Sequence, residues 1–422
     1  MSPSQGNDVD APTFAAVLRV RRYLPVFLAN ALSMWGDYIA RITIAAVVYN
    51  RTGSPLATAG TLAVSLVPTF LGRSLLGPLV DRMPYKWVLI WSHLLRATCV
   101  LVLMGMVLQN ASYWLLFLVL FVLELIGGAS TASYMVLLTD LVEDRRLYAK
   151  AVALGAMSEQ FNQAIGLAVG GGLIAIVGPE TGLVFDLVTF VVSAVVILFV
   201  VQVRPVHGER GRGVRGFARD LSSAASDLAR HPVLFRLMSL SAVACVGIVA
   251  PEALALPIAD GNRWGGVLMA SPIVGAVVGI VLIGRMDVLR QNRTIVPLAL
   301  AMPVPLLLAA LQPPLWVTMV LFFLSGVLQA FMVPLQATFA LTTEPAMRGR
   351  IFSLAGSVSV AAAGVSYLAA GWVAKYATPN GAVAICAAVC LVLTAVLAVT
   401  WPHRRVRLAV DSAYATTSSR AA

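Results

Sequence analysis

The sequence carries little charge for its length. Of its 422 residues only 12% are Asp, Glu, Lys or Arg, and 59% are hydrophobic, whereas an ordinary soluble domain is about 25% charged. Apolar runs of about 20 residues recur along almost the whole chain, and each is long enough to cross a bilayer as a helix. Because only short polar turns separate them, these runs cannot form the core of a water-soluble fold. The composition predicts an all-α polytopic membrane protein.

Cysteine and histidine are scarce, with four of each. Cys99, Cys245, Cys386 and Cys390 all fall in apolar runs, and no histidine stands at a metal-ligand spacing from them. His93 is the one histidine in a predicted span, near its cytoplasmic end, where an interfacial role is favoured. No nucleotide-binding motif is present. We therefore expect no metal, no cofactor, no direct use of ATP and no enzyme activity.

Two further classes are disfavoured by what the polar segments lack. The first 20 residues show neither the apolar core nor the cleavage site of a removable signal peptide, so the first span is expected to act as the targeting signal. The net charge is +11, but the basic stretch Gly208–Gly216 has no interleaved aromatics and no strand-loop-helix context. We interpret it as a topology signal between spans, and we expect no nucleic-acid partner.

The apolar runs divide into about twelve predicted helices. The first six cover about 22–48, 56–80, 86–108, 112–138, 149–177 and 180–203. The second six cover about 233–257, 263–285, 293–312, 313–341, 347–375 and 380–401. Since a pair of prolines readily ends or starts a helix, Gln312-Pro313-Pro314 separates the ninth from the tenth.

Lysine and arginine test that division, because cytoplasmic loops are enriched in them. With both termini inside, most of the 30 basic residues fall in inside segments, and the outside loops hold only Arg51, Arg263 and Lys375. A wrong number of spans would scramble this alternation. The pattern predicts an even number of spans, with both termini in the cytoplasm. We expect the membrane to be a bacterial inner membrane.

The longest loop divides the spans six and six. We predict a cytoplasmic tail (1–21), a six-helix bundle (22–203), a basic linker (204–232), a second bundle (233–401) and a cytoplasmic C-terminal tail (402–422). The second part of the linker, 216–230, has apolar residues near helical spacing and is predicted to lie along the membrane face. Two such halves indicate an internal duplication, a plan common in transporters that bind substrate between the halves.

A short polar motif joins the second and third predicted spans. It reads GPLVDRMPYK and resembles the loop signature of the major facilitator superfamily, with matches at Gly77, Asp81, Arg82 and Lys86. The resemblance implies a gating loop, because the glycine lets helix ends approach and the charges bridge to a neighbouring helix in one conformation only. The second half has a fainter echo, GRMDVLRQNR, in which Asp287 matches Asp81.

Other stretches resemble one branch of that superfamily, the macrolide-efflux and siderophore-exporter-like drug:proton antiporters. They are Gly36-Asp37, Tyr49–Ser54, Leu94–Ala97, Phe185–Phe190 and Arg348–Phe352. Two departures leave the direction of transport open. The fourth span has Glu124 without the branch's usual arginine, and GLAVGG in the fifth span has Leu167 in place of its proline. The paired glycines of the fifth span still permit close helix packing.

Charged side chains inside the predicted spans all belong to the first half, apart from Glu252 near the outer end of the seventh span. They are Asp37, Arg41, Arg73, Arg96, Glu124, Glu159 and Asp186. One charge at mid-bilayer costs about 2.5–3.5 kcal/mol on insertion scales. Left unrelieved, the set would cost on the order of 20 kcal/mol, more than a typical folding free energy of about 5–15 kcal/mol. We expect these groups to face one another or water.

These charges suit proton coupling. Burial favours a neutral carboxyl group and a nearby arginine favours a carboxylate, so an acid held between the two can bind and release a proton. Asp37 and Glu159 are the preferred carriers and Glu124 the third, with Arg41 and Arg96 as charge-balancing partners.

The alternative is permanent pairing that only fixes helix packing. It is favoured for Asp186 and Arg73, which lie nearer the predicted membrane faces.

The second half is apolar and rich in small residues. Candidates for an adaptable substrate wall are Met302, Phe331, Met332, Phe352 and Tyr367. Ordinary packing is the competing interpretation for each of them. Prolines in Ala301–Leu307 and at Pro272 and Pro334 predict kinks.

Taken together, the resemblance and the charges predict a monomeric secondary transporter that works by alternating access. Its expected partners are protons, the lipid bilayer and a hydrophobic or amphiphilic small molecule, which it exports. The alternatives are an importer or a lysolipid carrier of the same fold, and a non-transporting membrane sensor. A sensor would not need the gating motif.

Overall fold

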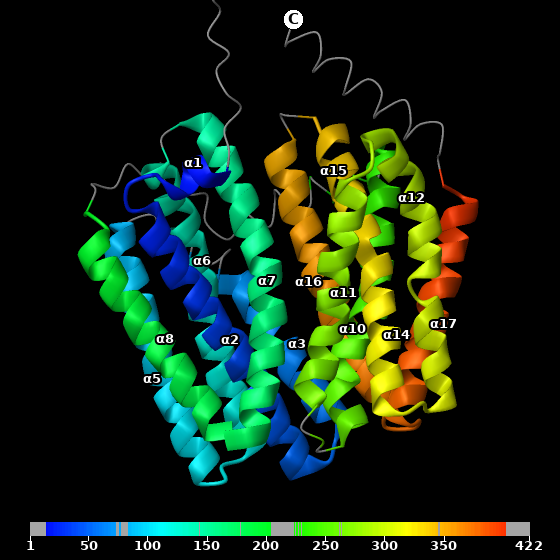
Figure 1. Cartoon of the computed structure of the whole chain (residues 1–422), viewed down its shortest axis with the longest axis horizontal. Helices are drawn as coiled ribbons and strands as arrows, with labels where there is room; N and C mark the ends of the chain where they lie inside the picture. The colour runs from blue at the N-terminus through cyan, green and yellow to red at the C-terminus, as the bar shows by residue number, and fades with distance from the viewer. Residues whose placement is uncertain are drawn as a thin grey trace, which may run out of the picture.

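The computed structural model is helical throughout its described part (Figure 1). That part comprises residues 14–72, 76, 83–142, 144–177, 179–203, 223, 225, 226, 228, 230–260, 262, 264–344 and 347–401. Within it, ten helical segments are long and apolar enough to cross a membrane. The chain is therefore a multi-pass membrane protein. Two further helices, α3 and α7, pack among these segments without meeting the same criteria of length and hydropathy.

The first bundle contains α1 to α8 in the numbering of Figure 1. Its helices are α1 (Phe14–Leu18), α2 (Tyr23–Thr52), α3 (Pro55–Leu71), α5 (Tyr85–Leu108), α6 (Tyr113–Leu141), α7 (Arg145–Val177) and α8 (Pro179–Val200). Gly53, with φ of 59°, ends α2 in the left-handed region that glycine adopts without strain. The Ser54 side chain then caps α3 by accepting from the Ala57 N–H, and Pro55 occupies the first turn.

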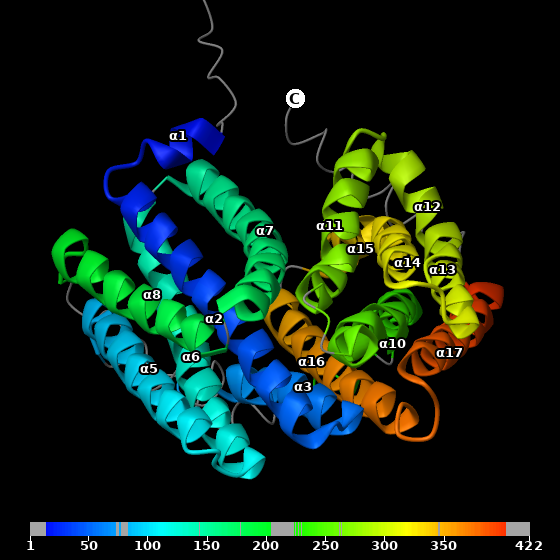
Figure 2. The same ribbon diagram turned by 60° about the horizontal axis from the view of Figure 1, so that its bottom comes forward.

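The second bundle contains α10 to α17. Its helices are α10 (Pro232–Ala259), α11 (Gly265–Gly284), α12 (Val288–Ala301), α13 (Val304–Leu307), α14 (Leu315–Leu328), α15 (Met332–Thr342), α16 (Arg348–Val373) and α17 (Pro379–Val399). Short 3₁₀ segments, Leu308–Leu311 and Gln329–Phe331, extend α13 and join α14 to α15. The two bundles lie side by side, and the described ends of the chain lie at the same end of the molecule (Figures 1 and 2). An even number of crossings is consistent with that placement.

Prolines break the helices of the second half at two of the three expected places. A proline clashes with the carbonyl four residues earlier. Four residues before Pro305, α12 ends at Ala301, and four residues before Pro334 lies the 3₁₀ segment. At Pro272, α11 continues without a break, and the Leu268 carbonyl accepts a hydrogen bond from the Ser271 hydroxyl at 2.7 Å. The serine replaces the donor that proline lacks.

Glycines bring several helices into backbone contact. A Cβ atom at Gly326 of α14 would lie 1.9 Å from the Pro272 carbonyl oxygen of α11, and one at Gly275 would lie 2.1 Å from that of Phe323. Glycines of the GLAVGG stretch allow α7 to pack closely on α2, as expected. A Cβ atom at Gly166 would lie 2.7 Å from the Cβ of Tyr38, and one at Gly170 would lie 3.0 Å from Ile39.

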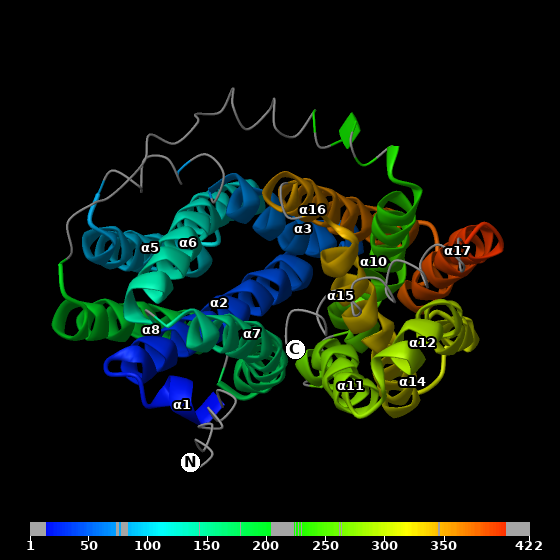
Figure 3. The same cartoon turned by 90° about the horizontal axis from the view of Figure 1, so that it is seen from above.

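The two halves contact each other at the end of the molecule opposite the described chain ends. There, α3 packs on α16 and α7 on α11, as the view from above also shows (Figure 3). One buried apolar cluster joins Ile42 and Ala59 of the first half to Val249 and Leu268 of the second. The Tyr49 hydroxyl adds a hydrogen bond to the Asp260 carboxylate at 3.3 Å. The buried clusters nearer the described chain ends each belong to one half.

Candidate functional site

Arg41 of α2 forms a two-pronged ion pair with Glu124 of α6. Its Nε and a terminal nitrogen donate to the two carboxylate oxygens at 2.6 and 2.8 Å. The Thr69 hydroxyl on α3 lies 2.9 Å from a Glu124 carboxylate oxygen and 2.8 Å from the Ser65 carbonyl oxygen, and its one hydrogen can serve either acceptor. The Glu124 side chain is only 2% exposed, whereas that of Arg41 is 22% exposed. Glu124 is therefore fully neutralised inside the bundle, with the arginine at its accessible edge.

Asp37 of α2 pairs with Arg96 of α5. The Arg96 guanidinium lies 4.3 Å from the centre of the Phe190 ring on α8, a cation–π distance. A Cβ atom at Gly127 of α6 would come within 3.3 Å of the same guanidinium. Asp37 is the more accessible partner, with a side chain 17% exposed against 5% for Arg96. Asp37 and Arg41, one turn apart on α2, thus pair with different helices rather than with each other.

Asp186 of α8 lies beside this second pair, within electrostatic range of Asp37 and Arg96. It is fully buried, and a Cβ atom at Gly36 of α2 would lie 2.3 Å from its Oδ1. His93 is also buried, with its ring 5.9 Å from that of Phe190. Both residues face inward because α5 and α8 pack closely along their length.

The remaining predicted carrier, Glu159 of α7, is exposed. It lies within electrostatic range of Tyr38 on α2. Among the described residues it pairs with neither Arg41 nor Arg96. Arg73 lies outside the described residues.

A polar pair of the second half faces Arg41. Tyr367 of α16 and Glu252 of α10 lie close enough to interact, and Arg41 lies within electrostatic range of both. Tyr38, whose ring centre is 5.4 Å from the Arg41 guanidinium, lies in the same region. The Arg41 region therefore contains charged and hydroxyl groups from both halves.

The gating motif is only partly described. Gly77, Asp81 and Arg82 lie outside the described residues, as does most of the predicted amphipathic segment of the linker. Lys86 donates from its Nζ to the Leu198 carbonyl oxygen of α8 at 2.7 Å, which ties the start of α5 to the end of α8. Asp287 is exposed and lies 4.0 Å from Arg290, a contact within one helix.

The five residues predicted as a substrate wall occupy different places. Met302 and Phe331 are buried in a cluster of the second half, with Met332 packed against it. Tyr367 belongs to the cluster that joins the halves. Phe352 is 43% exposed and packs its ring edge-on to Phe339 at 5.7 Å. In this conformation Met302 and Phe331 present almost no surface to a ligand.

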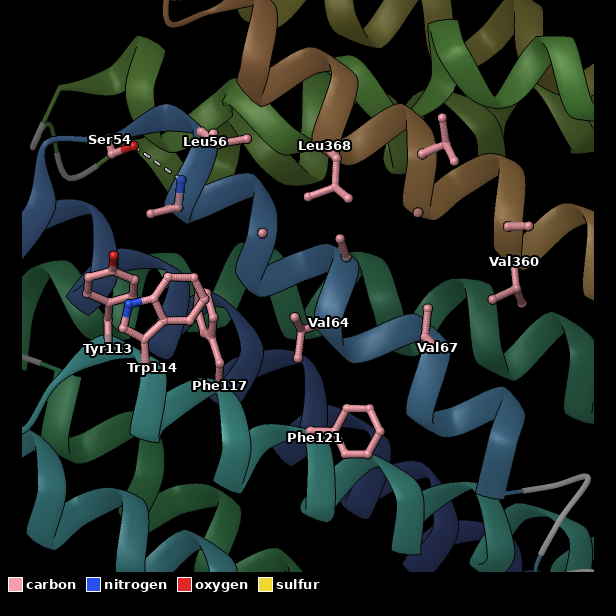
Figure 4. A pocket seen from close by; sticks show the side chains of 16 residues that line it. Ser54, Leu56, Val64, Val67, Tyr113, Trp114, Phe117, Phe121, Val360 and Leu368 are labelled. Carbon is pink, nitrogen blue, oxygen red and sulfur yellow. Dashed lines mark hydrogen bonds between the residues drawn. The ribbon is translucent and has the colours of Figure 1, made fainter.

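An apolar cavity of about 690 Å³ lies between α3, α6 and α16, away from the charged groups (Figure 4). The rings of Tyr113, Trp114 and Phe117 form one side. Val64 of α3 and Leu368 of α16 lie among the aliphatic groups opposite. None of the predicted wall residues lines it. Among the described residues, no group of three or more acidic, histidine or cysteine side chains is arranged to hold a metal ion.

The sequence profile of the Major Facilitator Superfamily matches residues 26–285, well over half of the chain. The chain belongs to that superfamily. The match runs through the first bundle and into the second, and so includes both arginine–carboxylate pairs.

Solved structures of major facilitator fold resemble this chain over most of its length. A single-residue mutant of the nucleoside transporter NupG superposes with a TM-score of 0.65 at 13% identity over 90% of this chain and 99% of that one. A bacterial homologue of the iron transporter ferroportin, in an inward-facing state, gives 0.64 at 17% identity over 89% and 98%. At such identities the likeness concerns the fold alone. No curated protein sequence matches the chain.

Sequence reasoning missed two features of this major facilitator chain. Glu252, predicted near the outer end of its span, lies close to Tyr367 and within electrostatic range of Arg41. The sequence could have indicated this place, because Glu252 is the one acidic residue predicted within the second-half spans. The position of Asp186 beside Asp37 was harder to predict. The one indication in the sequence was Gly36, next to Asp37, and residue spacing does not show that this glycine contacts α8.

Proposed function

We propose that this major facilitator chain is a secondary active transporter that exports a hydrophobic or amphiphilic small molecule in exchange for protons. The main support is the set of buried charges in the first half. Two arginine–carboxylate pairs and Asp186 lie within helices long enough to span a bilayer, and two members of the pairs, Asp37 and Arg41, are partly exposed. Intramembrane charges are expensive and commonly mark ion pathways.

The members of this set have different roles in the proposal. Asp37 is the first proton acceptor, because it is partly exposed and has one ion-pair partner. Glu159, which is exposed near Tyr38, is a second acceptor on the same route. Glu124 has a structural role, because Arg41 donates a hydrogen bond to each of its two carboxylate oxygens.

The position of Arg41 also supports alternating access. Arg41 is ion-paired with Glu124 of the first half and lies within electrostatic range of Glu252 and Tyr367 of the second half. A substrate that bound between the halves would meet these groups, and a rocking motion would change their separation. A cationic or hydrogen-bonding head group suits Glu252 and Tyr367.

The membrane arrangement belongs to the same proposal. With α3 and α7 added to the ten apolar segments, the chain makes twelve crossings, has both termini in the cytoplasm of a bacterial cell and acts as a monomer. The basic residues of the inside segments support the orientation. The motif Gly77–Lys86 and Asp287 are its gating elements.

Inside-out membrane vesicles with an imposed proton gradient test the function. The panel consists of tetraphenylphosphonium as a lipophilic cation, uridine, ferrous iron and lysophosphatidylcholine. We expect gradient-dependent accumulation of the lipophilic cation and little of uridine or iron. Vesicles without the protein provide the control. Uptake that ignores the gradient would refute proton coupling.

A lipid-moving carrier of the same fold is the second candidate. The apolar cavity between α3, α6 and α16 favours it. Its volume of about 690 Å³ and its mainly aliphatic and aromatic lining suit an acyl chain. In the vesicle assay this function predicts movement of lysophosphatidylcholine and not of tetraphenylphosphonium.

A further inference from the structure

Asp186 is the most deeply buried carboxylate among the described residues. Its exposed fraction is 0%, and neither of its carboxylate oxygens has a hydrogen-bond donor in the described part of the chain. The neighbouring Thr189 hydroxyl donates at 2.7 Å to the main-chain carbonyl of Asp186 and also lies close to its carboxyl group. An ionised carboxylate without a donor or a counter-ion is strongly unfavourable in such a place.

Helix α2 closes the space on one side of Asp186. A Cβ atom at Gly36 would lie 2.3 Å from Oδ1 of Asp186 and 2.3 Å from Oγ1 of Thr189. Only a residue without a side chain allows α2 and α8 to approach so closely. Since Asp37 follows Gly36 directly, the same turn of α2 carries the neighbouring carboxylate.

The charges around Asp186 come from three other helices. Asp37 of α2, Arg96 of α5 and Glu124 of α6 lie within electrostatic range of it. Arg96 pairs with Asp37, and Glu124 pairs with Arg41. Each nearby arginine is therefore engaged with another carboxylate.

The other titratable groups on the packed helices do not supply a partner. His93 of α5 is buried near Phe190, and its Nδ1 has no hydrogen-bond partner among the described residues. Glu159 of α7 is exposed and lies within electrostatic range of Tyr38. Asp37 and Asp186 thus both lie near Arg96. Among the described residues it is the one cation available to both carboxylates.

We propose that Asp186 holds a proton in this conformation, and that Asp37 and Asp186 share Arg96 as their counter-ion in a one-proton site. The proposal rests on the proton coupling proposed above and adds the group that stores the proton. Arg96 is suited to both carboxylates, because its Nε has no acceptor among the described residues. Its guanidinium stacks on Phe190, one helical turn from Asp186.

The exchange balances charge at each stage. In this structure Asp37 is ionised and paired with Arg96, while Asp186 is neutral. A proton that binds an oxygen of Asp37 breaks this pair, and the guanidinium then pairs with Asp186 as Asp186 releases its own proton. One proton enters, one leaves, and the three side chains together stay neutral. Asp37 is the entry side because it is 17% exposed, whereas Asp186 is fully buried.

Infrared spectroscopy of the full-length protein in lipid nanodiscs at neutral pH tests this assignment, because a protonated carboxyl group has its own carbonyl stretching band. Asp186→Asn should lose one such band. Asp37→Asn should lose it too, since Arg96 is then free to pair with Asp186 and ionise it. Glu124→Gln is the matched control and should keep the band, because Arg41 holds Glu124 ionised.

A band that persists in Asp186→Asn would overturn the assignment of the proton, and one that persists in Asp37→Asn would overturn the sharing of Arg96. If Asp186→Asn does not fold, wild-type protein labelled with ¹³C at aspartate carboxyl groups gives the answer. A single shifted aspartic acid band supports the proposal, and its absence refutes it. The spectrum needs no substrate, so its failure is distinct from a failure of gradient-driven transport.

Discussion

At the scale of single residues, the buried charges of the first half are neutralised across helices. Asp37 and Arg41 share one face of α2, as their spacing predicts, but Arg41 pairs with Glu124 of α6 and Asp37 with Arg96 of α5. Removing one partner of such a pair leaves the other as an unpaired buried charge, which costs more than removing both.

Replacing Arg41 with methionine should therefore destabilise the protein by about 3–5 kcal/mol, because it leaves the Glu124 carboxylate without its counter-ion. The double variant Arg41→Met/Glu124→Met should recover most of that loss. Thermal unfolding followed by tryptophan fluorescence in detergent measures both. A double variant less stable than Arg41→Met would contradict the pairing as described.

The sequence predicts which side chains need partners but not which partners they find. The cost of a charge in the bilayer made it certain that Arg41, Arg96 and Glu124 had to be neutralised. The choice of partner depends on how α2, α5 and α6 are rotated about their axes. That rotation is set by contacts such as Gly127 against Arg96 and Gly36 against Asp186.

At the scale of elements, glycines position the helices of each half. Where α11 packs on α14, a Cβ atom at Gly326 would lie 1.9 Å from the main-chain oxygen of Pro272. The obstructing atom belongs to the backbone, so it cannot move aside as a flexible side chain could. Overpacking of a well-packed contact typically costs about 1–3 kcal/mol.

Gly326→Ala should lower the stability of the protein by at least that amount, about 1–3 kcal/mol, by separating α14 from α11. Gly105→Ala is the matched control, because nothing lies within 4 Å of its Cβ position in α5. The control should be neutral or slightly stabilising, since alanine favours a helix over glycine. The midpoints of thermal unfolding compare the two. Equal effects would refute the close contact.

Helix positions followed from apolar runs, and their ends from caps and prolines. The range predicted as 86–108 is α5, Tyr85–Leu108, and that predicted as 233–257 is α10, Pro232–Ala259. The break at Ala301 and the 3₁₀ segment before Pro334 follow from proline geometry. At Pro272 the helix α11 is continuous, and the Ser271 hydroxyl bonds the Leu268 carbonyl that proline leaves without a donor.

At the scale of the whole molecule, the two halves meet at the end opposite the described chain ends. The apolar cluster of Ile42 and Val249 and the hydrogen bond from Tyr49 to Asp260 hold that end together. The alternating access proposed above requires these contacts to separate in the opposite conformation. The sequence pattern predicts two halves but not which end is joined, because on that proposal one sequence forms both conformations.

Tyr49→Phe removes the hydrogen bond between the halves and should weaken the joined end by about 0.5–1.5 kcal/mol. The population open at that end should then rise by about two- to tenfold. Spin-label distances between the ends of α2 and α10 measure this shift in lipid nanodiscs. Tyr376→Phe is the control and should leave the distances unchanged, because Tyr376 is exposed and its ring packs edge-on to Trp372 within one half. Unchanged distances in Tyr49→Phe would contradict a latch at this position.

Proton coupling by the buried charges of the first half, as proposed above, is best tested with Asp37→Asn in inside-out vesicles. Asn keeps the shape of Asp37 but cannot carry a proton. We expect at least a tenfold loss of gradient-driven accumulation of tetraphenylphosphonium, with exchange of labelled for unlabelled probe retained. Full gradient-driven accumulation by the normally expressed variant would refute proton coupling through Asp37.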